Sequence, residues 1–157
     1  MPIHGLPFTD EQLFNLINIV LPGWLILAVA PRWCHSQPLS AVAALLMSLL
    51  YAALLLSSIL FSESSERLDI ADMFTYKGVV RLLANRSAAL PCWVHFAAFD
   101  LWVGRWITRD AVFREVPRIL FTLCLLITMM FGPAGLLLYH LVRIPFPSEE
   151  NQKRKSA

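Results

Sequence analysis

Charged residues are scarce in this chain of 157 residues. Asp, Glu, Lys and Arg together make up 15% of it, whereas soluble domains usually carry about 25%. Hydrophobic residues make up 57%, and the mean hydropathy is +0.61. A soluble core of this size cannot bury so much apolar surface. The composition therefore excludes an ordinary soluble domain and predicts an integral membrane protein.

Cysteine is also rare, and its pattern excludes a disulfide framework. The three cysteines, Cys34, Cys92 and Cys124, form neither a CxxC pair nor a zinc-like spacing, so we interpret them as free thiols. The net charge is only +2 and the basic residues are scattered, so no nucleic-acid surface is expected. Basic residues are missing ahead of the first apolar run, so no secretory signal is expected either.

Four apolar stretches follow one another, over residues 13–30, 39–61, 88–107 and 116–141. Each is close to the roughly 20 residues that a helix needs to cross a bilayer. Pro22-Gly23 predicts a kink in the first stretch. The polar connection 62–87 is expected to hold a short amphipathic helix near residues 76–83 that lies on the membrane. We therefore predict an all-α protein with a single domain of four transmembrane helices over residues 1–147 and a polar basic tail over residues 148–157.

Four crossings also predict an orientation. The N-terminus, the 62–87 connection and the tail would share one side of the membrane, together with eight of the 13 basic residues. Because basic residues concentrate on the cytoplasmic side, both termini are expected on the cytoplasmic or stromal side. The basic residues 153–155 would there face anionic lipid headgroups.

Ionisable residues in the third stretch are the main candidates for function. His95, Asp100 and Arg105 are spaced by five, which puts His95 and Asp100 about 140° apart around a helix. Such residues are expensive inside a membrane and usually face protein or water. His95 and Asp100 could form an acid/base pair, or Asp100 and Arg105 could be a structural pair while His95 bonds a neighbouring helix. A metal held by His95, Asp100, Asp110 and His140 is a third possibility, but their spacing matches no strong motif, so no metal is expected.

Three stretches carry a resemblance to a known family. They are Leu13-Phe14-Asn15 through Leu21-Pro22-Gly23-Trp24 and Pro31-Arg32-Trp33, then residues 92–106 (CWVHFAAFDLWVGRW), and residues 131–139 (FGPAGLLLY). Together they resemble the abscisic-acid-deficient-four-like family, whose plant members act in neoxanthin synthesis. The middle stretch is the most specific, because a run of that length rarely recurs by chance.

The resemblance implies a four-helix membrane protein that acts on a carotenoid. In plants the conversion turns the 5,6-epoxide of violaxanthin into an allene and a tertiary alcohol, with no net redox change, so no cofactor is expected. We assign His95 and Asp100 as the catalytic acid/base pair. Substrate binding is assigned to aromatic and polar residues on the same helix and its neighbours: Asn15, Trp24, Trp93, Phe96, Phe99, Trp102, Arg105 and Tyr139.

Two other functions stay open at this point. The chain could be a non-catalytic protein that binds a carotenoid or another isoprenoid lipid, or that helps assemble a pigment–protein complex. A small transporter is less favoured, because the sequence has no inverted repeat and no second charged span. Four helices make a thin wall around a long polyene, so a homodimer or a partner complex is expected. The location would be a chloroplast membrane in a plant or alga, and otherwise the bacterial inner membrane.

Overall fold

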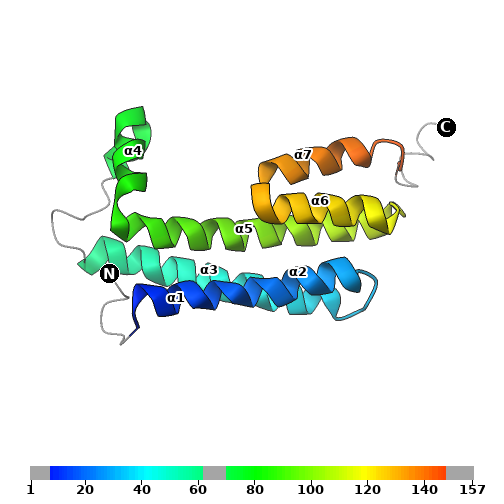
Figure 1. Ribbon diagram of the computed structural model, residues 1–157, viewed down its shortest axis with the longest axis horizontal. Coiled ribbons are helices and arrows are strands. Elements are labelled where there is room, and N and C mark those ends of the chain that lie inside the picture. Colours follow the sequence, from blue (N-terminus) through cyan, green and yellow to red (C-terminus); the bar gives the residue numbers. More distant parts are fainter. Residues whose placement is uncertain (1–7, 62–69, 148–157) are drawn as a thin grey trace. The chain divides into compact units, whose positions relative to one another are not determined.

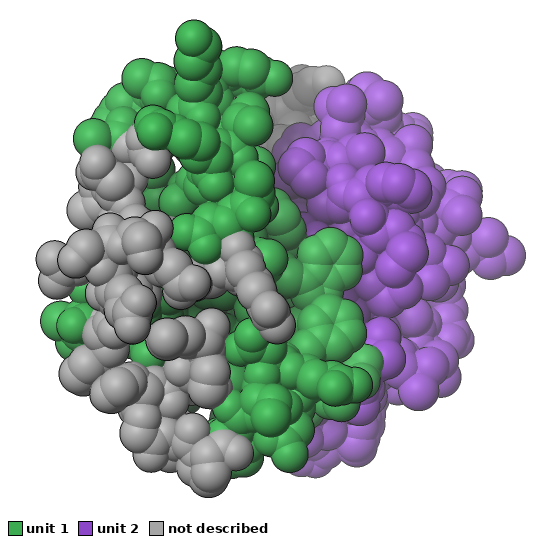
Figure 2. Space-filling view, turned by 60° about the vertical axis from the view of Figure 1, so that its left-hand side comes forward, with its two compact units in different colours: residues 1–19, 45–98 green, residues 20–44, 99–157 purple. Residues whose placement is uncertain are grey.

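A computed structural model describes residues 8–61 and 70–147, and all regular structure in this part of the chain is helical (Figure 1). The chain divides into two compact units, which Figure 2 colours separately. Unit 1 comprises residues 1–19 and 45–98, and unit 2 comprises residues 20–44 and 99–157. Helices α3 (Ser36–Phe61) and α5 (Arg86–Phe113) each contribute residues to both units.

The first apolar stretch forms two helices separated by a short irregular turn. Helix α1 (Asp10–Leu16) is followed by a 3₁₀ turn (Ile17–Ile19) and helix α2 (Val20–Val29). Pro22 has no N–H to donate to the carbonyl one turn earlier, which explains why the regular helix is interrupted just ahead of it. A capping box starts α1, because Thr9 Oγ1 accepts from the Gln12 amide while Gln12 Oε1 accepts from the Thr9 amide.

The second and third apolar stretches are the long helices α3 and α5. In the described part of the chain, two stretches are long and apolar enough to cross a membrane, namely Asp10–Val29 and Ser36–Leu60. Helix α5 has sufficient length, with 28 residues, but it carries Asp100 and Arg105 along its middle. The all-α prediction is confirmed, whereas length and composition support only the first two of the four predicted crossings.

Unit 1 is built around a small apolar core. Leu13 and Ile17, before α2, pack with Leu54 of α3 and Val94 of α5. The amphipathic helix expected near residues 76–83 is confirmed as α4 (Tyr76–Ala84), which follows a 3₁₀ turn (Ile70–Phe74). Thr75 caps α4, since its hydroxyl accepts a hydrogen bond from the Gly78 amide at 3.1 Å.

The prediction of a single transmembrane helix over residues 116–141 is corrected by the structure of unit 2. The chain instead forms α6 (Arg118–Phe131) and α7 (Pro133–Val142), which fold back on each other and run side by side (Figure 1). Gly132 joins them with φ at +41°, a conformation that disfavours any side chain, and Pro133 starts α7. Gly135 permits the close approach, because a Cβ there would overlap the Thr128 backbone. We name this pair of helices the α6–α7 hairpin.

Candidate functional site

His95 lies in unit 1, on a pocket of about 150 Å³. Its ring packs at a tilt against Tyr51 of α3, with the ring centroids 5.0 Å apart, and it also contacts Phe96. The other lining side chains are mainly apolar and come from α3, α4, α5 and the 3₁₀ turn before α4: Leu55, Met73, Leu82, Ala88, Pro91 and Cys92. The pocket is therefore an apolar hollow with an imidazole and a phenol on its wall.

The other residues that we assigned in unit 1 have different surroundings. Phe96 lines the His95 pocket, although its side chain is 55% exposed. Trp93 borders a separate groove, together with Phe14, Asp10 and Glu11 at the start of the chain. Asn15 is exposed on α1. Tyr51 and Cys92 also line the pocket and were not predicted from the sequence. For Cys92 a signal was present, because its spacing of three from His95 puts both residues on one face of a helix.

Asp100 lies in unit 2, directly against the break between α6 and α7. A Cβ added to Gly132 would stand 2.7 Å from Asp100 Oδ1, so a side chain at this position would displace the carboxylate. The half-buried Asp100 thus contacts the one position where the α6–α7 hairpin leaves helical geometry. A carboxylate at such a place can accept or give a proton, which keeps Asp100 a candidate acid/base group.

Parts of the first two family-like stretches meet inside unit 2, where side chains pack against glycines. A Cβ on Gly104 of α5 would overlap the indole of Trp24 on α2, so Trp24 fills the space that the glycine leaves. Gly23 on α2 in turn faces Leu101 of α5, and a Cβ added to Gly23 would stand 3.1 Å from Leu101 Cδ2. Trp24 is 6% exposed and Leu101 is fully buried. Trp24, which we assigned to substrate binding, is therefore a packing residue of unit 2 in this structure.

Arg105 ties α5 to the first turn of α3. Its Nε donates to Ser40 Oγ at 3.2 Å and to the Gln37 carbonyl at 3.3 Å, and its Nη2 donates to the same carbonyl. The guanidinium also lies 4.5 Å from the centroid of the Trp102 ring, a cation–π contact. Gln37 Nε2 returns a bond to the Arg105 carbonyl. Phe99, six residues earlier on α5, is 60% exposed.

A polar cluster at the end of α5 was not predicted from the sequence. Asp110 Oδ2 accepts from the Tyr139 hydroxyl at 2.7 Å, from Arg114 Nε at 2.8 Å and from Arg143 Nη1 at 3.3 Å. Tyr139 is fully buried and packs edge-on against Trp106, over which Arg143 also lies. We name these five residues the Asp110 cluster.

The Asp110 cluster has a defined electrostatic character. Burial by itself would raise the pKa of Asp110, but the hydrogen bonds from Tyr139 and Arg114 and the charges of Arg114 and Arg143 outweigh it. The pKa of this carboxyl is therefore held below its usual value. The i, i+4 spacing of Asp110 and Arg114 was visible in the sequence, but the separation of 29 positions between Asp110 and Tyr139 concealed the rest.

The predicted site residues thus divide between the units. Unit 1 holds His95, Phe96, Trp93 and Asn15, and unit 2 holds Asp100, Trp24, Phe99, Trp102, Arg105 and Tyr139. The four residues that we considered as metal ligands do not gather: across residues 8–61 and 70–147, no three His, Cys, Asp or Glu side chains lie close enough together to hold a metal ion.

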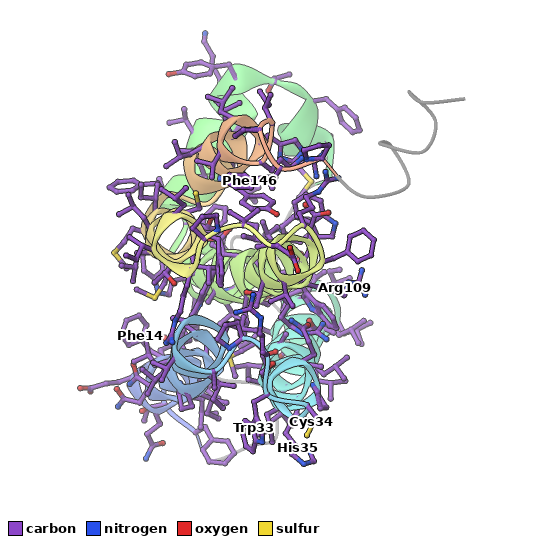
Figure 3. The ribbon with its side chains drawn as sticks, turned by 90° about the vertical axis from the view of Figure 1, so that its right-hand side faces the viewer. Phe14, Trp33, Cys34, His35, Arg109 and Phe146 are labelled. Atoms are coloured by element: carbon purple, nitrogen blue, oxygen red, sulfur yellow. The ribbon has the colours of Figure 1, made fainter. Side chains whose placement is uncertain are left out.

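The Trp33 and His35 rings, seen with Cys34 in the turn after α2 (Figure 3), pack edge to face.

Comparison with known proteins returns one family. Searches of curated proteins and of solved structures find no significant match to the chain. The family model described as ABA DEFICIENT 4-like matches residues 12–139, which include all three of the stretches singled out above. The chain belongs to the ABA DEFICIENT 4-like family.

Proposed function

We propose that this protein is an integral membrane isomerase that converts an epoxy-carotenoid, or a closely related isoprenoid epoxide, into its allenic isomer. Family membership supports the substrate class by analogy. The observation that carries the proposal is the His95 pocket, because it offers an imidazole and a phenol on a mainly apolar wall.

The size of the pocket fits one end of a long ligand. Pockets that enclose a whole drug-sized ligand usually measure about 300–1,000 Å³. At about 150 Å³, the His95 pocket suits a single cyclic end group. The remaining polyene would lie along exposed apolar side chains, of which α5 offers Trp93 and Phe96 in unit 1. Carotenoids combine these two features, a compact ring and a long apolar chain.

The proposed reaction needs one acid and one base. The acid gives a proton to the epoxide oxygen, and the C–O bond to the ring carbon next to the polyene breaks. The base removes the proton from the adjacent vinylic carbon, and the freed electron pair forms the second of the two cumulated double bonds. No electron is gained or lost overall. We assign the two proton transfers to His95 and Asp100, because an imidazole and a carboxyl group can each give or accept a proton.

A second candidate is a non-catalytic carotenoid-binding or assembly protein. The exposed aromatic side chains of α5 favour it, since Trp93, Phe96 and Phe99 are each 55–60% exposed. Such a surface can hold a polyene or contact a second copy or a pigment–protein partner. The protein would reside in a chloroplast membrane if its source is a plant or an alga, and otherwise in a bacterial inner membrane.

The test is pigment chromatography of a host that makes violaxanthin and expresses the chain. We expect a new allenic pigment with the unchanged protein, and its loss with His95→Ala or Asp100→Asn. His35→Ala is a matched control outside both candidate positions and should retain the product. Unchanged yield in either test variant would refute its assignment. Pigment that co-purifies without conversion would instead support the binding protein.

A further inference from the structure

We infer that the α6–α7 hairpin is a re-entrant element, which enters and leaves the bilayer on the same side, and that the chain makes three crossings rather than four. The inference rests on the membrane location proposed above and is independent of the carotenoid chemistry. All the contacts that carry it lie within unit 2.

The return of α7 to the start of α6 is fixed by specific contacts. If residues 118–142 formed one helix, Tyr139 would lie about 30 Å along its axis from Arg118. Instead the Tyr139 hydroxyl bonds to Asp110, near the end of α5, 2.7 Å away. Arg143 reaches the same carboxylate, and Arg114 Nη1 donates to the Phe146 carbonyl at 3.2 Å. Only the short turn 114–117 separates α5 from α6, so both ends of the hairpin lie at the end of α5.

The hairpin is too short to cross hydrocarbon. With 14 and 10 residues, α6 and α7 measure about 21 and 15 Å, whereas the hydrocarbon core is about 30 Å thick. Its tip provides an independent measure, because Gly132 lies against Asp100, ten residues before Asp110 on α5. Ten helical residues span about 15 Å. The tip therefore reaches about half the depth of a bilayer.

A re-entrant tip requires non-helical backbone to be covered by protein. Gly132 is buried, and Thr128 and Gly135 beside it are buried as well. The Thr128 hydroxyl is satisfied by the Cys124 carbonyl at 2.8 Å. The non-helical backbone at Gly132 therefore packs against α5 at Asp100. A hairpin that ends within hydrocarbon needs its non-helical backbone to be covered by protein in this way.

The base of the hairpin lies at the same end of unit 2 as the turn between α2 and α3 (Figure 1). Arg118, which starts α6, donates through Nη2 to the Val29 carbonyl at 2.6 Å and through Nε to the Ala28 carbonyl at 3.3 Å. These carbonyls end α2, where a cation is favoured. The turn after α2, the turn after α5 and the end of α7 therefore face the same side of the membrane.

This topology moves the N-terminus and α4 to the side opposite to the predicted one and keeps the tail on its predicted side. With three crossings, the tail joins the side of the turn after α2, and that side then holds nine of the 13 basic residues: Arg32, Arg105, Arg109, Arg114, Arg118, Arg143, Lys153, Arg154 and Lys155. The other side keeps four, Arg67, Lys77, Arg81 and Arg86. Arg105 lies between Asp100 and Asp110 and therefore within the span. Without it the count is eight against four for three crossings and also for four, so the basic residues give the orientation of the chain and the contacts of the hairpin give the number of crossings. The positive-inside rule then puts the turn after α2 and the C-terminus in the cytoplasm, and the N-terminus and α4 on the opposite side.

Cysteine labelling in sealed vesicles tests the inference. Three single-cysteine proteins are made in a background with the other thiols removed: native Cys34 in the turn after α2, Tyr76→Cys on α4 and Ser156→Cys in the tail. A membrane-impermeant maleimide is applied to right-side-out and to inside-out vesicles. We expect Cys34 and Ser156→Cys to label only in inside-out vesicles, and Tyr76→Cys to label only in right-side-out vesicles.

The outcomes are distinct. Labelling of Tyr76→Cys and Ser156→Cys from one side and of Cys34 from the other would establish four crossings and overturn the inference. Labelling of all three positions from one side would instead contradict the proposed membrane crossings themselves. Because Cys124 is fully buried and its replacement can impair folding, a C-terminal epitope tag on the otherwise unchanged chain, digested by protease from each side, gives an independent reading.

Discussion

Replacing Tyr139 by Phe removes one hydroxyl from the centre of the Asp110 cluster. The ring of Tyr139 is fully buried, so the phenylalanine ring keeps its packing against Trp106 while the 2.7 Å hydrogen bond to Asp110 is lost. Hydrogen bonds to charged groups are worth about 1.5–3 kcal/mol. Asp110 keeps Arg114 and Arg143 as donors, and its side chain is 17% exposed, so the lower end of that range applies.

The expected loss is therefore about 1.5–2 kcal/mol. For a chain of this size, each kcal/mol lowers the melting temperature by about 2–4 °C, which predicts a decrease of about 3–8 °C. Thermal unfolding of the detergent-solubilised protein measures it. Tyr76→Phe is the matched control, because the Tyr76 side chain is 85% exposed and its substitution should change little. A melting temperature for Tyr139→Phe that equals the wild-type value would refute the role given to the Asp110 cluster.

Three further predictions concern unit 2. The pKa of Asp110 is lowered in the folded protein, so the ionised carboxylate should stabilise the fold above about pH 4. This stabilisation should be lost as the pH falls through the pKa that Asp110 has in the folded protein. Asp110→Asn should remove this dependence of the melting temperature on pH. Gly135→Ala should destabilise the α6–α7 hairpin by more than about 2 kcal/mol, since its Cβ would overlap the Thr128 backbone, and an unchanged melting temperature would contradict the close approach. Gly104→Ala should also destabilise, and the smaller ring of Trp24→Phe should recover part of the loss in a double-mutant cycle, whereas purely additive effects would show that the two residues do not meet.

The sequence was sufficient where local rules decide the structure. Thr9 and Gln12 have the spacing of a capping box and form one, and α4 appears where an amphipathic pattern predicted it. The break ahead of α2 follows from the missing N–H of Pro22. In each case the residues that determine the feature lie within about one turn of it. The family resemblance, read from short stretches, is confirmed over residues 12–139.

The hairpin could not be read from hydropathy, and the reason is physical. Residues 116–141 are apolar on both sides of Gly132-Pro133, and this pair is compatible with a kink as well as with a reversal. The positive φ of Gly132 and the contact of Gly135 with Thr128 determine that the chain reverses its direction here. The apolar length of residues 116–141 thus predicted one helix that crosses the membrane. The backbone conformation at Gly132 instead reverses the chain and divides the stretch into α6 and α7. The assignment of His95 and Asp100 as a catalytic pair stays a prediction.

The most direct test of the proposed chemistry uses purified protein in lipid vesicles with violaxanthin as the only added substrate. Pigments are then separated and their masses and absorption spectra recorded. We expect a time-dependent allenic product of unchanged mass, which is absent with Asp100→Asn and with His95→Ala. Violaxanthin recovered unchanged from vesicles in which the protein is folded and binds it would contradict the proposed isomerase.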